Sequence, residues 1–122
     1  MKPGYRQSLG HLGESLAADF LKDQGYMIIG RNFRTPYGEI DLVAQIDEVI
    51  VFVEVKTRAS KSLGPPEISI TPKKQEHIRC AAEYYIQLHV ELHNDWRIDV
   101  ITIQIPKADS PPLIDHFQNA IS

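Results

Sequence analysis

Two stretches of the sequence decide the fold: Gly38-Glu39-Ile40-Asp41-Leu42-Val43-Ala44 and Val49-Ile50-Val51-Phe52-Val53-Glu54-Val55-Lys56. Both are rich in β-branched and aromatic residues, and the short polar gap between them is typical of a turn, so they predict a pair of antiparallel strands. The second stretch is apolar up to Val53, as in a buried strand, and then carries Glu54 and Lys56. Buried ionic groups are costly unless they are paired or bound to a metal, so these charges indicate a functional site.

Further helix and strand patterns lie on either side of this hairpin. Ser8 as a cap, apolar residues at helical spacing and Gly25 as a stop predict a helix over about 8–24. Thr71-Pro72 is typical of the start of a second helix, which we expect to reach about Leu92. The remaining ranges predict strands over 26–33, 39–45, 49–56 and 96–105, an exposed loop over 57–70, and a small strand or docking segment over 113–121.

The order α-β-β-β-α-β predicts an α/β fold in which a mixed sheet is flanked by helices. The first three strands suit an antiparallel meander, and the second helix can carry the chain to a parallel strand. With 122 residues, 43% of them hydrophobic, we expect a single domain over residues 1–122 that folds without disulfides or a structural metal.

Composition also bears on location and partners. Cys80 is the only cysteine, which suits a reducing compartment, and the sequence contains no signal peptide or membrane helix pattern. We therefore expect a cytoplasmic protein with no membrane partner. The net charge of -3 argues against a strongly basic nucleic-acid coat but leaves room for a local basic patch.

Asp41, Glu54 and Lys56 can converge at one edge of the sheet if the hairpin pairs in the expected register. Two neighbouring carboxylates repel each other, and a divalent cation relieves that repulsion while gaining hard oxygen ligands. The pattern therefore predicts Mg²⁺ or Mn²⁺ on Asp41 and Glu54, the carbonyl of Val55 as a further ligand, and Lys56 as an aid to the nucleophile. Glu14 lies on the flank of the first helix's apolar stripe, where it can reach the same pocket as an additional ligand.

Other polar residues are candidates for supporting roles. Glu39 shares a strand face with Asp41, and we expect Glu39 and Gln75 to support the metal ligands rather than to touch the ion. Lys73 and Lys74 lie at a predicted helix N-terminus, which favours anions. The candidates for contacts with nucleic-acid phosphates are Arg31, Arg34, Arg58, Lys73 and Lys74.

Several of these residues also have plainer explanations. The two acids and Lys56 could form a cross-strand salt bridge on a solvated face, although such a face would not place Glu54 behind so apolar a strand. Asp99 is expected to make a structural hydrogen bond. His89 and His93 have a spacing that can bind zinc, yet no third ligand is evident and a solvated helix face is expected. Tyr37 is either an ordinary turn aromatic or a residue that stacks on a base.

Several motifs together resemble one known family. The motifs are similar, over nearly the whole chain, to those of the YraN-like family of uncharacterised bacterial proteins. They are His11-Leu12-Gly13-Glu14, Arg31-Asn32-Phe33-Arg34, Gly38-Glu39-Ile40-Asp41-Leu42-Val43-Ala44, Val51-Phe52-Val53-Glu54-Val55-Lys56-Thr57-Arg58, Lys74-Gln75 and Arg97-Ile98-Asp99-Val100.

The spacing of the acids resembles a larger group of proteins. Asp41, twelve intervening residues and then Glu54-Val55-Lys56 resembles the PD-(D/E)xK pattern of the restriction-endonuclease-like superfamily, with Ile40 in place of its frequent proline. An acid on the first helix followed by these groups is also similar to archaeal Holliday junction resolvases.

These resemblances imply a restriction-endonuclease-like fold and a metal-dependent DNA endonuclease that hydrolyses phosphodiester bonds. Branched or damaged DNA is the expected partner. A homodimer is also expected, because symmetric cutting of both strands of a junction needs two active sites. The alternative is a non-catalytic nucleic-acid or protein-binding module that retains a nuclease-like fold.

Overall fold

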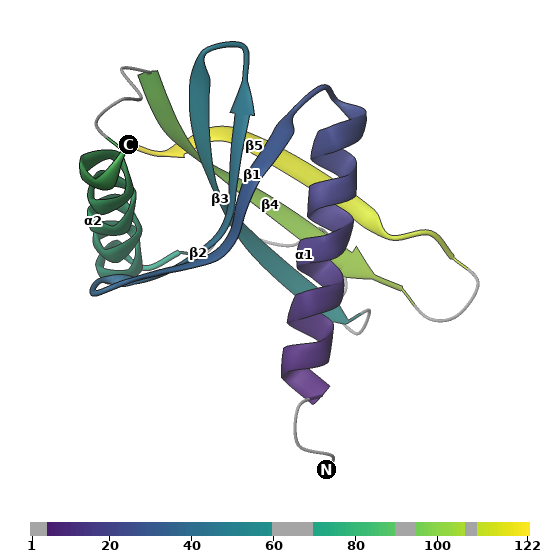
Figure 1. Cartoon of the computed structure of the whole chain (residues 1–122). Coiled ribbons are helices and arrows are strands. Elements are labelled where there is room, and N and C mark those ends of the chain that lie inside the picture. The colour runs from purple at the N-terminus through teal and green to yellow at the C-terminus, as the bar shows by residue number, and fades with distance from the viewer. Residues whose placement is uncertain (1–4, 60–69, 90–94, 107–109) are drawn as a thin grey trace.

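The computed structural model describes residues 5–59, 70–89, 95–106 and 110–122. Within these ranges the chain forms helices on both faces of one sheet (Figure 1). The elements, in chain order, are α1 (Tyr5–Asp23), β1 (Met27–Thr35), β2 (Gly38–Ile46), β3 (Val49–Ala59), α2 (Pro72–Leu88), β4 (Asp95–Ile105) and β5 (Leu113–Ile121).

The sheet has the order β1-β2-β3-β4-β5. Its first three strands form the predicted antiparallel meander, and α2 carries the chain to β4, which is parallel to β3. The predicted α/β class with a mixed sheet is confirmed. The tail forms β5, antiparallel to β4, so the full order is α-β-β-β-α-β-β. The expected order stopped one strand short, because the sequence left a strand and a docking segment equally open at 113–121.

Two boundaries differ from expectation. β3 continues to Ala59, where a loop was expected from residue 57, because β4 pairs with β3 along its whole length, as far as Ile105. The second helix ends at Leu88 rather than about Leu92, and its C-cap residue His89 has non-helical dihedral angles. Residues 60–69, which make up most of the expected loop, and residues 90–94 lie outside the described residues.

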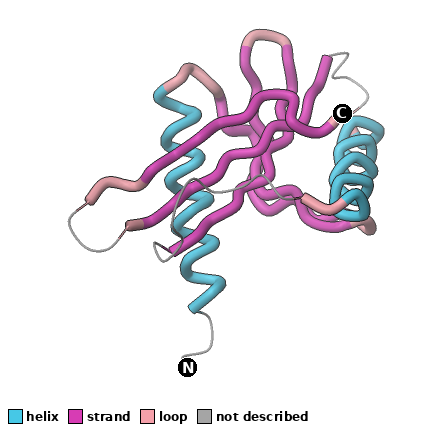
Figure 2. Tube along the Cα trace, turned by 180° about the vertical axis from the view of Figure 1, so that it is seen from behind, coloured by secondary structure: helices cyan, strands magenta, loops and turns pink. Residues whose placement is uncertain are grey.

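Each helix covers its own face of the sheet, and the tube in Figure 2 shows the two helices on opposite sides of the strands. Alternation along β3 explains how both faces are filled, since Val51 and Val53 face the α1 core while Ile50 and Phe52 face the α2 core. No helix in the described part of the chain is long and apolar enough to cross a membrane. The buried helix residues that complete the cores are Ala17, Ala18 and Leu21 of α1 and Ile78, Ala81, Ala82 and Tyr85 of α2.

The backbone of α1 lies directly against β3 at Gly13. A Cβ atom added there would lie 1.8 Å from Oγ1 and 2.9 Å from Cβ of Thr57. Only a glycine allows this approach without a shift of the helix or of Thr57. The contact sets how closely α1 lies on the sheet, and it therefore sets the position of the next residue, Glu14.

A buried polar network joins β5 to β4. The side chain of Asp99 is fully buried; it accepts hydrogen bonds from Nε of Arg97 at 3.0 Å and the backbone N–H of Asn119 at 2.9 Å, and Nε2 of His116 lies 2.7 Å from it. The phenolic oxygen of Tyr26 accepts a further bond from Arg97 at 2.9 Å. Burial alone would raise the pKa of Asp99, but these donors outweigh burial and lower it below its ordinary value. The structural hydrogen bond expected for Asp99 is confirmed.

The close contact at Gly13 predicts opposite effects for two glycine substitutions in α1. Gly13→Ala should lower the free energy of unfolding by about 1–3 kcal/mol, because the added methyl overlaps Thr57. Gly10→Ala is the matched control: its Cβ would meet nothing within 4 Å, so the gain in helix propensity should stabilise the protein by up to about 1 kcal/mol. Urea denaturation of both variants measures the difference, and equal changes would contradict this packing.

The Asp99 network predicts a pH-dependent loss of stability. Asp99→Asn should lower the free energy of unfolding at pH 7 by about 1–3 kcal/mol, because it removes the buried counter-charge of Arg97, whose side chain is 21% exposed. A lowered pKa stabilises the folded state only above the ordinary pKa of 3.8, so the difference from wild type should shrink as the pH falls below about 4. Thermal melts from pH 3 to pH 7 test this, with the exposed Asp115→Asn as control. A constant difference over that range would contradict it.

Candidate active site

β2 and β3 are paired along only part of their length and then diverge. Their pairing ends at Leu42 and Val53, while β3 stays paired with β4 as far as Ala59. Figure 1 shows the β1–β2 hairpin bending toward α2 and β3 continuing beside β4. We call the opening between the diverging strands the fork, and define it by Asp41 of β2 and by Glu54 and Lys56 of β3.

Where the backbone hydrogen bonds between β2 and β3 end, a side chain of β2 bonds to the backbone of β3 instead. The carboxylate of Asp41 accepts a hydrogen bond from the backbone N–H of Val55 at 2.8 Å. The bond satisfies a strand N–H that no longer has a backbone partner on β2, and it fixes the Asp41 carboxylate beside β3. The sequence predicted that the Val55 carbonyl binds the metal. In the structure the observed contact of the Val55 backbone with Asp41 is made by its N–H.

A cluster of three acidic side chains from α1 and β2 lies at the fork. Carboxylate oxygens of Glu14, Glu39 and Asp41 all lie within 4.8 Å of one another. The amide of Asn32 holds two of these acids, donating to Glu14 at 2.8 Å and to Glu39 at 2.9 Å. Glu39, which the sequence placed in a supporting role, therefore lies among the potential ligands themselves.

Sequence reasoning missed Asn32. Its backbone has a φ of 50°, in the left-handed region that asparagine tolerates better than most residues. That conformation lies in a strand that also has a register shift between Ile28 and Gly30, and the Asn32 amide reaches acids on two other elements. In the sequence Asn32 stands among strand-forming residues and within the family-like motif Arg31-Asn32-Phe33-Arg34, but neither feature specified a partner.

On the other side of the fork lies the acid of β3, Glu54, whose side chain is only 13% exposed. Its carboxylate lies 3.6 Å from the ammonium of Lys74 at the start of α2. A pocket of about 230 Å³ opens here and is lined by Glu54, Lys56, Ile70, Thr71 and Lys74. Thr71 caps α2 by accepting the N–H of Lys74 at 3.2 Å, so the helix terminus holds this lysine beside the fork.

Burial raises the pKa of both central acids, and repulsion by Glu54 adds to the shift at Asp41. The pKa of Asp41 is raised from 3.8 to about 7, first by burial and then by the charge of Glu54, with smaller contributions from Glu14 and Glu39. Burial also raises the pKa of Glu54, although Lys74 and Lys56 oppose that shift. Asp41 and Glu54 act on each other, so the structure brings together the two residues that the sequence paired.

The predicted cations differ in their surroundings. Arg34 is paired with Glu39 at 3.6 Å, and Arg31 donates to the hydroxyl of Ser15 at 3.2 Å. Lys73 is exposed on the first turn of α2, and Arg58 is half-buried on β3, two residues beyond Lys56. Lys74 is ion-paired with Glu54 of the fork, and Arg34 with Glu39 beside it. Arg31, Arg58 and Lys73 lie on β1, β3 and α2, the elements around the fork.

Two further predicted residues lie away from the acids. Gln75 donates to the backbone carbonyl of Ile70 at 2.9 Å, so it secures the segment that enters α2. His89 stacks on the ring of Tyr85 with centroids 4.1 Å apart, and its Nδ1 lies 2.8 Å from the Tyr85 carbonyl oxygen. His93, the other half of the histidine pair, lies outside the described residues.

The donor set at the fork suits a hard divalent cation. Carboxylate oxygens from α1 and β2 lie within 4.8 Å of one another, and Glu54 of β3 acts electrostatically on Asp41. The raised pKa of Asp41 reflects burial and a repulsion that a cation would relieve, and the described residues place no cysteine or histidine in this carboxylate cluster. Lys56 and Lys74 add positive charge beside the acids, where it can attract a phosphate. The fork can therefore bring an anionic oxygen compound against a bound metal.

Comparisons with known proteins agree on one family. The model of the uncharacterised protein family UPF0102 matches residues 13–103, a range that contains every candidate residue of the fork. A UPF0102 protein of Dehalococcoides mccartyi is 41% identical over 116 residues, covering 95% of this chain and 94% of that protein.

Two further relatives are similar in extent. A UPF0102 protein of Caldicellulosiruptor bescii is 44% identical over 115 residues and covers 93% of this chain and 97% of its own. One of Clostridium perfringens is 50% identical over 101 residues, 81% of each chain. The family resemblance drawn from the sequence motifs is confirmed, and the chain belongs to the uncharacterised protein family UPF0102.

Proposed function

We propose that this protein is a divalent-metal-dependent DNA endonuclease of the restriction-endonuclease-like type, with the fork as its active site. The observation that carries the proposal is the meeting of Asp41 and Glu54 where β2 leaves β3, with Lys56 two residues further along the same strand face. A salt bridge on a solvated face would not raise the pKa of Asp41 to about 7, so repulsion between buried acids supports a cation site instead.

The residues that would hold Mg²⁺ or Mn²⁺ are Asp41 and Glu54, with Glu14, Glu39 and the carbonyl of Val55 as further candidates. When bound, the cation supplies Lewis-acid chemistry: it polarises a phosphodiester, lowers the pKa of water and neutralises the charge on a leaving oxygen. Asn32 orients Glu14 and Glu39 for this role, because its amide holds one oxygen of each.

The chain's own cations would position the substrate. Lys56 and Lys74 line the pocket beside Glu54 and can bind the phosphate that is to be cut. The N-terminal turn of α2 borders the same pocket and also favours an anion. Lys56 is the candidate for stabilising the additional negative charge of the transition state, because it lies on β3 beside Glu54.

Arg31, Arg58 and Lys73 are the candidates for contacts with more distant phosphates of the DNA backbone. Branched or damaged DNA is the proposed substrate, since a chain of 122 residues covers only a short stretch of duplex. A twofold dimer would present two forks to the two strands of a junction. These assignments follow from the proposed chemistry of the fork and from the resemblance to junction resolvases.

A cleavage assay tests the proposal directly. Single-stranded, duplex, flapped and four-way-junction DNA would be incubated with Mg²⁺ or Mn²⁺ and with wild-type protein, Glu54→Ala or Lys56→Ala. We expect cutting of at least one substrate, and a loss of at least about 100-fold in rate in both variants, because each removes a group that acts on the phosphate or the metal.

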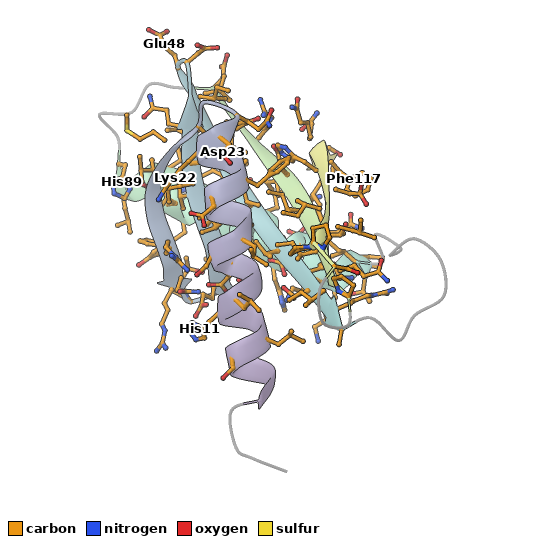
Figure 3. The ribbon with its side chains drawn as sticks, turned by 90° about the vertical axis from the view of Figure 1, so that its right-hand side faces the viewer. His11, Lys22, Asp23, Glu48, His89 and Phe117 are labelled. Carbon is orange, nitrogen blue, oxygen red and sulfur yellow. The ribbon has the colours of Figure 1, made fainter. Side chains whose placement is uncertain are left out.

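The matched control is Glu48→Gln, which removes an acid at the β2–β3 turn. Figure 3 shows Glu48 at the opposite end of the molecule from His11, whose part of α1 carries Glu14. This variant should cut as wild type does. DNA binding without cleavage, unchanged in Glu54→Ala, would contradict the nuclease and favour the binding module with a nuclease-like fold.

Metal binding gives a second prediction, which does not require turnover. Mn²⁺ should raise the melting temperature of wild type more at pH 8 than at pH 6, because protons compete with the metal below the Asp41 pKa of about 7. Asp41→Asn should abolish this metal-dependent shift.

In the metal-free protein the same variant should have the opposite effect. A raised carboxyl pKa favours the folded state below pH 3.8, and that contribution is lost as the pH rises through about 7. Asp41→Asn should therefore melt higher than wild type at pH 8 in EDTA. The control is Asp47→Asn in the β2–β3 turn. Aspartate and asparagine both tolerate the φ of 52° at this position. An equal response of wild type and Asp41→Asn to Mn²⁺ would contradict the site.

A further inference from the structure

Two small hollows lie side by side along α2, next to the tip of the β1–β2 hairpin. Each has a volume of about 80 Å³. Tyr37 borders both hollows. The first hollow is otherwise lined by Gly38, Glu39, Lys74, His77, Ile78 and Ala81, and the second by Cys80, Glu83, Tyr84 and Gln87.

The hairpin turn presents the Tyr37 ring in a fixed way. The hydroxyl of Thr35 accepts the N–H of Tyr37 at 3.0 Å and donates to the carbonyl of Gly38 at 2.7 Å, which closes the turn. The ring makes an edge-to-face contact with Tyr84 of α2, with centroids 6.4 Å apart. Tyr37 nevertheless remains 48% exposed. A large aromatic residue held from two sides and still open to solvent is organised for a ligand with a flat apolar face.

The first hollow is connected to the fork through Glu39 and Lys74, which contact groups at both places. Glu39 lines the first hollow, and its carboxylate also lies within 4.8 Å of those of Glu14 and Asp41. Lys74 lines both this hollow and the pocket beside Glu54, and its ammonium lies 3.6 Å from the Glu54 carboxylate. A DNA strand with a phosphate at the fork can therefore place a nearby nucleotide next to Tyr37.

Lys74 and His77 can attract a phosphate at one side of the first hollow, but the rest of the lining favours a base. Ile78 and Ala81 provide apolar surface in the first hollow, while a carboxylate stands in each hollow, Glu39 in one and Glu83 in the other. Carboxylates repel a phosphate but accept hydrogen bonds from the amino groups of bases. The hollows are small, at about 80 Å³ each, so the ligand would lie mainly against the exposed ring of Tyr37.

We propose that Tyr37 stacks on an unpaired base of the DNA strand that is cut at the fork. A base in a continuous duplex is stacked between its neighbours, so the ring can reach it only where the strand is single or interrupted. The substrate class is therefore DNA with unpaired nucleotides next to the scissile phosphate, such as a flap, a gap or the open centre of a branch. The inference rests on the proposed function, because it takes DNA as the ligand of the fork.

Equilibrium binding tests this directly, without the need for cleavage. Oligonucleotides with 2-aminopurine in a short gap, in either flap polarity, or in an otherwise identical complete duplex would be titrated with the full chain in Ca²⁺. The protein would be wild type, Tyr37→Ala, Tyr37→Phe or Leu113→Ala. The last variant removes another exposed apolar side chain, on β5 rather than at the hairpin. Thermal melts would confirm that each variant is folded.

We expect wild type to bind at least one unpaired substrate more tightly than duplex, and to change its 2-aminopurine fluorescence. Tyr37→Ala should weaken that binding about tenfold and leave duplex binding unchanged, because it removes one stacking contact. Tyr37→Phe should restore both the affinity and the fluorescence change, and Leu113→Ala should behave as wild type does.

The inference would be overturned if Tyr37→Ala bound unpaired DNA as tightly as wild type does, or if it lost as much affinity for duplex as for unpaired DNA. It would also be overturned if wild type bound unpaired DNA no more tightly than duplex. The cleavage assay separates this result from the proposed function. Cutting that depends on Glu54 but not on Tyr37 would leave the nuclease standing and overturn the stacking site. Binding that depends on Tyr37 without cutting under any metal would support the stacking site and contradict the nuclease.

Discussion

The hydrogen bond from the backbone N–H of Val55 to the carboxylate of Asp41 links the shape of the sheet to its chemistry. β2 can turn away from β3 only if the strand groups that lose their partners find others, because an unsatisfied buried N–H is costly. Asp41 supplies that partner and is thereby held next to Glu54. The bend that takes the β1–β2 hairpin to α2 and the placement of the central acid are therefore two results of one contact.

The pKa values of two aspartates, the buried Asp99 and the half-buried Asp41, are shifted in opposite directions, and the difference lies in their neighbours. Asp99 receives hydrogen bonds from Arg97, His116 and Asn119, which hold its pKa below the ordinary value despite burial. Asp41 has one backbone donor and three acidic neighbours, so burial and repulsion raise its pKa to about 7. The first environment stabilises a carboxylate within the fold. The second leaves a charge deficit that a cation can fill, which is why the fork and not the Asp99 network carries the proposed metal.

Much of this arrangement could be predicted from the sequence, because it depends on strand alternation and turn spacing. These local patterns predicted the meander, the parallel crossover and the pairing of Asp41 with Glu54. The rest depends on contacts between distant segments. β5 lacks a strong pattern of its own and is held by Asp99 and His116, while the role of Glu39 depends on the left-handed conformation of Asn32. In both cases the two residues that interact are not adjacent in the sequence, so patterns of adjacent residues do not predict the contact.

Lys74 shows how the proposed metal and phosphate sites would depend on each other. In the metal-free fork its ammonium is the counter-charge of Glu54, and it opposes the rise of that residue's pKa. A cation bound to Glu54 would supply the same neutralisation more strongly, so the free-energy cost of moving Lys74 away from Glu54 would fall. Lys74 already borders both the pocket at the fork and the hollow beside Tyr37, where a DNA strand would offer it a phosphate. Metal binding should therefore favour binding of the strand, and the strand should in turn favour retention of the metal.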